Sequence, residues 1–298
     1  MKLQGALALA LLLAPMEAAA DLLRGDSAHR AGQLRLAFDE FRASAEAGEA
    51  EAQYRLALML DAGEGVAADP AAALAWLRKA AAQGHAEAAR AVGVYYEEGK
   101  AVARDDAEAA RWYERAARAG NDKAQRNLGQ LYAAGRGVAR DERKAAEWWA
   151  RSAEQGNAKA ARNLAYLYYY GRGVPRDPEK AAQLFAEAAR DGEARAEYNL
   201  GFVYYNGRGV ERDLVRAAEH FRRAAQRGDA DAQLFLARLH LTGEGAPQDL
   251  ERAFFWTLVG SAQKPSLAEY YFDQLRGRLP RAAQDRLRAE AAAFRPSD

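Results

Sequence analysis

A loop of the form Gly-x-Gly-Val-x-x-Asp, or a close variant, occurs six times in the chain and is the first candidate for chemistry. Glycine-rich loops let backbone N–H groups approach a phosphate. No Gly-Lys-Ser or Gly-Lys-Thr follows these loops and no strand pattern precedes them, which disfavours phosphate binding. The leading glycines are 36 residues apart, at Gly63, Gly99, Gly135, Gly171, Gly207 and Gly243, and the closing aspartates are Asp69, Asp105, Asp141, Asp177, Asp213 and Asp249. We interpret the glycines as helix ends and the aspartates as helix caps before any acid–base role.

Metal and nucleophile chemistry find no support in the sequence. The four histidines, His29, His85, His220 and His240, are scattered, no His-Glu-x-x-His occurs, and there is no cysteine. No Gly-x-Ser-x-Gly elbow is present either. His220 and His240 fall in columns of core residues, which favours packing. We therefore predict a protein without catalytic residues, metal or cofactor.

Aromatic side chains also recur with the 36-residue period, at Trp76, Trp112, Trp148 and Trp256. Such a column is able to stack on sugars or peptides, but its spacing places it on the alanine-rich side of a helix, which favours a core role. Trp149 is the candidate for contact with a partner, because the adjacent indoles of Trp148 and Trp149 cannot both point the same way.

Arginines near the loop edge form a further periodic set. They are Arg104, Arg140, Arg176 and Arg212, with Arg136, Arg172 and Arg208. We expect neighbouring aspartates to neutralise the charge of these arginines. The alternative is that the arginines form a surface for an acidic partner.

Two helices are predicted between successive glycine loops. Asp69 is placed to cap the first helix, and Pro70 suits its first turn because the missing N–H would be unpaired there. A second column of glycines, Gly48, Gly84, Gly120, Gly156, Gly192 and Gly228, ends that helix. The second helix carries an apolar column of Leu56, Val92, Leu128, Leu164, Leu200 and Leu236. An exact period of two helices predicts a solenoid, in which each unit needs its neighbours to bury its apolar faces.

The repeat resembles the Sel1-like repeat family, relatives of the tetratricopeptide repeat. Residues 124–156 carry most of the pattern: Ala124, Leu128, Gly129, Tyr132, Gly135, Gly137, Val138, Asp141, Lys144, Ala145, Trp148, Ser152, Ala153 and Gly156. The resemblance implies an all-α, right-handed superhelical solenoid of about seven antiparallel helix pairs with a C-terminal capping helix.

The chain divides into four predicted segments. Residues 1–20 resemble a cleavable signal peptide, with Lys2, an alanine-leucine run shorter than a membrane span, and small residues before Asp21. Residues 21–48 form an N-terminal capping helix, 49–264 six repeats, and 265–298 C-terminal capping helices. The net charge of +1 disfavours nucleic-acid binding.

The expected function is a periplasmic or secreted protein-interaction scaffold, with no stable membrane insertion after signal cleavage. The resemblance implies adaptor or regulatory roles in the cell envelope, with a protein or peptide partner docked along the concave face that the first helix of each unit lines. The residues predicted there are Arg111, Arg115, Arg118, Glu147, Arg151, Glu187, Arg222 and Arg223, together with Trp149. Simple solvated ion pairs are the alternative for these charged residues, and the arginine-rich loop edge is the alternative surface. The rival functions are a peptidoglycan- or glycan-binding module and, less favoured, an envelope hydrolase.

Overall fold

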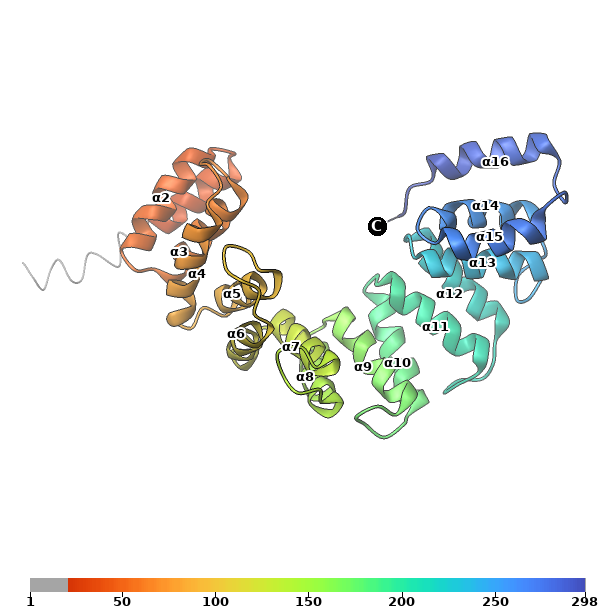
Figure 1. Ribbon diagram of the computed structural model, residues 1–298, viewed down its shortest axis with the longest axis horizontal. Coiled ribbons are helices and arrows are strands. Elements are labelled where there is room, and N and C mark those ends of the chain that lie inside the picture. Colours follow the sequence, from red (N-terminus) through yellow and green to blue (C-terminus); the bar gives the residue numbers. More distant parts are fainter. Residues whose placement is uncertain (1–20, 298) are drawn as a thin grey trace, which may run out of the picture. The chain divides into compact units, whose positions relative to one another are not determined.

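The computed structural model describes residues 21–297, which contain helices and no strand (Figure 1). The predicted signal peptide lies outside the described residues. Two compact units divide the chain, the first ending at Trp148 and the second beginning at Trp149. The all-α repeat solenoid predicted from the sequence is confirmed.

Consecutive helices are joined alternately by a glycine loop and by a shorter link. After a helical stretch at residues 21–30, the first unit contains α2 (Leu34–Glu46), α3 (Ala50–Ala62), α4 (Pro70–Ala82), α5 (Ala86–Glu98), α6 (Asp106–Arg118) and α7 (Asp122–Ala134). The boundary falls within α8 (Glu142–Glu154). The second unit contains α9 (Ala158–Tyr170), α10 (Pro178–Arg190), α11 (Ala194–Asn206), α12 (Leu214–Gln226), α13 (Ala230–Thr242), α14 (Leu250–Ser261), α15 (Pro265–Leu275) and α16 (Arg281–Ala293).

The glycine loop has one conformation that recurs along the chain. Gly171, for example, ends α9 in the left-handed region at φ +70°, as a glycine without a side-chain clash can do. The N–H of Asp177 then bonds to the carbonyl of Tyr168 at 2.9 Å, and its side chain accepts the N–H of Lys180 to cap α10. The predicted roles of the loop glycine and the loop aspartate are confirmed.

This tight loop decides which helices form a pair. The helices on either side of a glycine loop, such as α9 and α10 or α11 and α12, pack more extensively than those joined by the shorter links, such as α10 and α11. The hairpin unit therefore begins with the helix before the glycine loop. Our sequence-based order, which placed the helix after the loop first, is corrected accordingly.

In the first five hairpins, the second helix buries one large side chain at the same repeat position, and Thr257 occupies this position in the sixth. The large side chains are Leu77, Tyr113, Trp149, Phe185 and Phe221, all buried. Alanines such as Ala109 and Ala124 are fully buried between them and let the helices approach closely. The neighbouring tryptophans Trp76 and Trp112 are partly buried against the same core, in agreement with the predicted packing role.

Both ends of the array are covered. At the N-terminal end, α2 buries Phe38 and Phe41, and the helical stretch at 21–30 adds a layer that the sequence analysis did not separate from it. At the C-terminal end, α14 is apolar on several sides and packs against both α15 and α16. Phe272 of α15 meets Phe254 at 5.8 Å, and Phe294, just after α16, meets Trp256 at 5.6 Å. These contacts match the predicted cover of α14.

Candidate functional site

The predicted charged residues lie on the second helix of their hairpins. Arg111, Arg115 and Arg118 belong to α6, Glu147 and Arg151 to α8, Glu187 to α10, and Arg222 and Arg223 to α12. Several of them form ion pairs with neighbours on the same helix, such as Arg118 with Glu114 and Arg223 with Glu219. Exposed pairs of this kind contribute little to stability, about 0.3–0.5 kcal/mol. They lie on the helix after the glycine loop, where the sequence analysis placed them, and this helix is the second of its hairpin and not the first.

Trp149 does not belong to this surface. Only 5% of the residue is exposed, and it lies in the same core column as Tyr113 and Phe185. A ring buried to this extent cannot stack on a sugar or a peptide. We therefore remove Trp149 from the candidate partner-binding residues.

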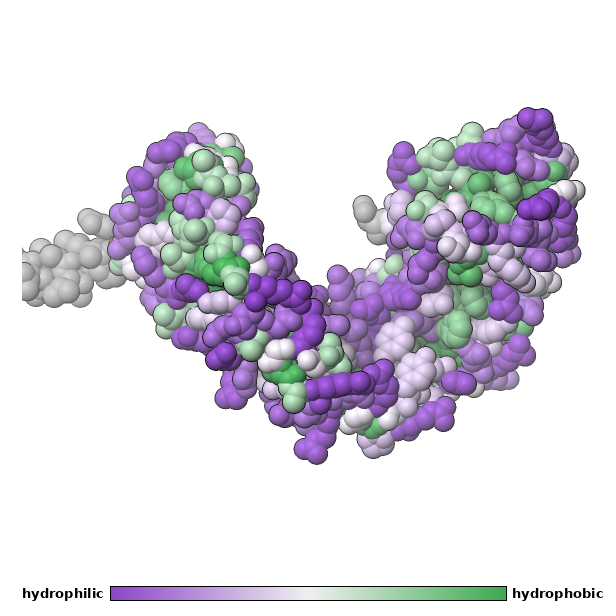
Figure 2. Space-filling view, in the orientation of Figure 1, coloured by the Kyte–Doolittle hydropathy of each residue, from purple (hydrophilic) through white to green (hydrophobic). Residues whose placement is uncertain are grey.

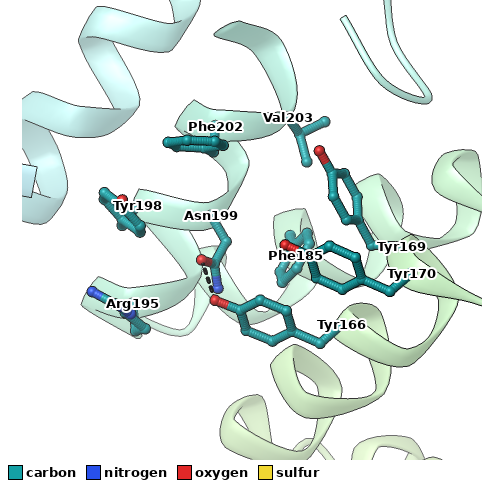
Figure 3. A pocket seen from close by; sticks show the side chains of 9 residues that line it. All are labelled: Tyr166, Tyr169, Tyr170, Phe185, Arg195, Tyr198, Asn199, Phe202 and Val203. Atoms are coloured by element: carbon teal, nitrogen blue, oxygen red, sulfur yellow. Dashed lines mark hydrogen bonds between the residues drawn. The ribbon is translucent and has the colours of Figure 1, made fainter. Parts of the chain in front are cut away.

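A pocket that the sequence analysis missed opens between α9 and α11 in the second unit (Figure 3). Its volume is about 240 Å³, and most of its lining is aromatic. The lining residues are Tyr166, Tyr169 and Tyr170 from α9, Phe185 from α10, and Arg195, Tyr198, Asn199, Phe202 and Val203 from α11. In Figure 2 the surface over these helices is paler, and so less hydrophilic, than the strongly hydrophilic surface beside it.

The aromatic rings hold one another in place. Tyr166 meets the buried Phe185 edge-on at 5.5 Å and stacks on Tyr170, one helical turn later, at 6.2 Å. On the facing helix, Tyr198 and Phe202 are also one turn apart, with ring centroids separated by 5.8 Å. Pairs with such geometries contribute about 0.5–1.5 kcal/mol beyond their burial, so the walls are preorganised.

Two of these rings are nevertheless open to solvent. Tyr170 is 57% exposed and Phe202 is 38% exposed. Large apolar side chains that lie close together at the surface mark interaction sites more often than single ones do.

The ring cluster continues from α11 to the next repeat. Phe202 meets Phe235 of α13 at 5.6 Å, and Tyr205 meets the same ring at 5.2 Å. Arg238 lies over the Phe235 ring, 5.3 Å from its centroid. The aromatic strip therefore includes side chains from α9, α11 and α13, all within the second unit.

Asn199 is the buried amide in the pocket lining. It is 5% exposed, and its Oδ1 accepts the hydroxyl of Tyr166 at 2.7 Å. Its Nδ2 is buried and has no hydrogen-bond partner. A buried donor without an acceptor costs about 1–3 kcal/mol, so an acceptor placed beside this amide would stabilise the pocket.

Arg195 fixes the other side of the pocket. Its guanidinium lies 4.6 Å from the centroid of the Tyr198 ring and pairs with Asp229 and Asp231 from the start of α13. Burial by itself lowers the pKa of Arg195, but the hydrogen bonds and charges of the two aspartates outweigh it and raise the pKa. Its charge is therefore permanent and compensated.

Tyr166 and Tyr198 stay neutral at physiological pH. Burial raises the pKa of Tyr166, and the charges of Arg195 and Arg162 oppose this only in part. Burial also raises the pKa of Tyr198, to about 12. The rings thus present uncharged faces to a ligand.

The pocket arises where the repeats differ from one another. The position of Tyr166 and Phe202 is occupied elsewhere by Leu58, Val94, Gln130 and Arg238, and that of Tyr170 by Ala62, Glu98, Ala134, Asn206 and Thr242. Helix stacking therefore does not require a ring at these positions. The pocket could have been found from the sequence by comparing the exposed residues of the first helix between repeats, because rings occur there in only some of them.

The remaining candidates have structural roles. His85 caps α5, and His220 stacks on Tyr204 at 5.4 Å and pairs with the buried Glu197. In the part of the chain that the structure describes, no group of histidines and carboxylates is arranged to hold a metal. At the loop edge, Arg104 and Arg140 pair with Asp106 and Glu142 respectively, in line with the neutralisation favoured from the sequence.

The paired helices, the capped glycine loops and the preorganised surface pocket together define an α-solenoid repeat protein of the interaction type. A family model of the Sel1 repeat matches residues 50–85, 86–121, 122–157, 158–193, 194–229 and 230–264, and the chain belongs to this family. Each match begins with the helix before the glycine loop, in agreement with the pairing in the structure. Sel1 repeat proteins are generally protein–protein interaction scaffolds, and the fold is typically non-catalytic.

Two solved structures are similar over most of the chain. A protective antigen of uropathogenic Escherichia coli strains that displays an SLR fold is 34% identical with a TM-score of 0.80, and the match covers 93% of this chain. The chain spans 61% of the length of that antigen. A Sel1 repeat protein from Oxalobacter formigenes is 30% identical with a TM-score of 0.74, and the match covers 81% of this chain and 99% of that one.

No sequence among the curated proteins matches the chain. Within residues 21–297, none of the helices combines the length and the apolar character needed to cross a membrane.

Proposed function

We propose that this protein is a non-catalytic scaffold of the bacterial cell envelope that docks a protein partner through an extended segment at the aromatic pocket of α9 and α11. The observation that carries the proposal is a preorganised aromatic pocket whose exposed rings, Tyr170 and Phe202, the repeat does not require. A scaffold needs only such a preformed surface, and the charge of Arg195 is already compensated by Asp229 and Asp231.

The charged residues on α6, α8, α10 and α12 are a second candidate surface. The exposure of Arg118, with 72% of its side chain accessible, supports this alternative. The aromatic pocket is favoured because buried rings and a buried donor supply more binding free energy than solvated ion pairs do.

Export is the second part of the proposal. It rests on residues 1–20, whose basic start, apolar run and small residues before Asp21 are typical of a cleavable signal. Mass spectrometry of the protein recovered from cells tests it. A mature chain that begins at Asp21 in the soluble envelope fraction is the expected result, and a chain that retains Met1 in the cytosol would contradict export.

Affinity capture with matched variants tests the docking surface. Immobilised wild-type protein is incubated with the soluble envelope fraction of the source cell, beside the variants Tyr170→Ser, Arg118→Glu and Val215→Ser. Val215 is 61% exposed on α12, outside the pocket, and controls for the loss of an exposed apolar side chain. We expect one partner to be retained by all except Tyr170→Ser. Loss on Arg118→Glu alone would assign docking to the charged surface instead.

A further inference from the structure

A second groove of the second unit lies where α8 ends and α9 begins, beside the C-terminal end of α10. Its volume is about 360 Å³. The argument uses six of its lining residues, Gly156, Asn157 and Ala161 on one side and Glu187, Arg190 and Asp191 on the other. This surface is separate from the aromatic pocket, and the inference drawn from it goes beyond the proposed function.

The chain's own C-terminal segment covers the equivalent groove two repeats later. After α16 the chain turns back toward the array (Figure 1). Gly228 is the repeat equivalent of Gly156, and it lines a pocket together with Phe294 and Pro296. A Cβ built on Gly228 would be 3.1 Å from Cγ of Pro296, whereas one built on Gly156 would meet nothing within 4 Å. The same groove is therefore filled by a peptide segment at Gly228 and open at Gly156.

The contacts of this segment show what the groove holds. Phe294 leaves α16 in an extended conformation, with φ −59° and ψ 132°, and its ring meets Trp256 at 5.6 Å. The N–H of Ser297 donates to the carbonyl of Gln226, the last residue of α12, at 2.9 Å. Carbonyls in the last turn of a helix have no partner within the helix. The segment is thus held by apolar contact and by a donor to the end of a helix.

The same carbonyl position accepts a side-chain donor in the first unit. Ala82, the last residue of α4, is the repeat equivalent of Gln226, and Nη2 of Arg115 donates to its carbonyl at 3.3 Å. In the open groove, Glu154 at the end of α8 takes the place of Ala82, and Glu187 takes the place of Arg115. An ionised carboxylate has no hydrogen to donate. A donor for the end of α8 can therefore come from a docked segment.

The charge of the open groove selects the kind of segment. Glu187 and Asp191 are both exposed, and among residues 21–297 neither carboxylate forms an ion pair. The lining contains Arg190, which offsets one of the two charges. The C-terminal ends of α8 and α10 add the negative ends of two helix dipoles. A segment that brings positive charge and N–H donors complements this groove.

We propose that the groove between Gly156 and Glu187 docks an extended, basic segment of a protein partner, arranged as residues 294–297 are arranged on Gly228. A lysine or arginine of the segment pairs with Glu187 and Asp191. A backbone N–H of the segment donates to the carbonyl at the end of α8, and an apolar residue covers Gly156.

Fluorescence anisotropy with the purified protein tests this inference. The probe is the amidated peptide Ala-Phe-Arg-Pro-Ser, the sequence of residues 293–297, with an N-terminal fluorescein. The control probe has glutamate in place of arginine. We expect saturable binding of the arginine probe below about 1 mM protein, and binding of the control probe at least about fivefold weaker.

Matched charge reversals locate the site. Glu187→Lys should weaken binding of the arginine probe at least about fivefold. Glu211→Lys makes the same change at an exposed position in the loop before α12, outside the groove. It should change the affinity less than about twofold in about 0.1 M salt, where charges more than about 10 Å apart are largely screened.

Three results would overturn the inference. They are equal binding of the two probes, no saturation of the arginine probe, or equal affinities of Glu187→Lys and the wild type. A dimer of the purified protein that both Phe294→Ser and Glu187→Lys dissociate would assign the groove to the tail of a second copy instead. Capture of a partner through Tyr170 is a separate measurement, so none of these results decides the proposed function.

Discussion

Gly137 lies against the start of α6 so closely that a Cβ built on it would be 2.0 Å from the carbonyl oxygen of Asp106. Gly209 has the same relationship to Pro178, at 2.2 Å, and Gly245 to Leu214, at 2.1 Å. The second glycine of the loop is therefore the point at which one repeat touches the helix of the repeat before it. The sequence motif contains two glycines for two different reasons, a left-handed helix end and a close approach between repeats.

Replacing Gly137 with alanine should destabilise the protein far more than the same change at Gly120. Both residues have a positive φ, which costs about 1–3 kcal/mol for alanine. A Cβ at Gly120 would meet nothing within 4 Å, whereas one at Gly137 would displace the backbone of Asp106. We expect Gly137→Ala to lose at least about 2 kcal/mol more than Gly120→Ala in urea unfolding. Equal losses would show that the loop can move away without cost.

Trp149→Ala should lower the free energy of unfolding by about 3–5 kcal/mol, because it removes a large buried ring from the core column. Unfolding in urea measures this change. An exposed ring would instead give a change within about 0.5 kcal/mol, and that result would restore Trp149 as a surface residue.

Asn199→Leu should separate stability from binding. Leucine has a similar volume and removes the unpaired Nδ2, while Tyr166, which is only partly buried, can donate to water instead. We expect a melting temperature equal to or above that of the wild type. Retention of the partner in the capture experiment should nevertheless fall, since this donor is gone. A large loss of stability would mean that the amide has a structural partner.

Acid should remove the stabilisation that Asp231 provides. Burial by itself raises the pKa of Asp231, but the hydrogen bonds and charges of Arg195 and Lys264 outweigh it and hold the pKa below the usual 3.8. A carboxylate whose pKa is lower in the folded state than in the unfolded state stabilises the fold at pH values above its unfolded-state pKa. This contribution is lost as the pH falls through the folded-state pKa.

Urea midpoints of the wild type and of Asp231→Asn measure this effect. The wild type should be the more stable protein near pH 6, and the difference should close as the pH falls below 3.8. Parallel curves for the two proteins over the whole range would contradict the assigned role of Asp231.

The fold could be predicted from the sequence because the helix-end residues and the apolar stripes recur with the same 36-residue period. Asp177 before Pro178 and Gly171 after an apolar stripe specify the two ends of helices with little help from packing. The order of the hairpin did not follow, because helix pairing depends on how tightly the loop closes between Tyr168 and Asp177. The helix at residues 21–30 was also missed, since it lies ahead of the periodic pattern.

The candidate site was less predictable than the fold. Charged side chains such as Arg115 were chosen because they vary between repeats, but variation at exposed positions also occurs where no partner binds. The positions of Tyr170 and Phe202 also differ between repeats. The structure shows that their rings line one pocket, together with other rings of α9, α10 and α11. The free donor of Asn199 could not be read from the sequence, because the hydrogen bonding of an amide is a property of its surroundings.

Photo-crosslinking in the source cell tests the docking surface most directly. Benzoylphenylalanine is placed at position 170, in the pocket, or at position 215, where the native Val215 is as exposed as Tyr170. The account predicts a single protein adduct from position 170 and none from position 215, with the adduct abolished by Phe202→Ser. Adducts of equal yield from both positions, or from position 215 alone, would contradict it.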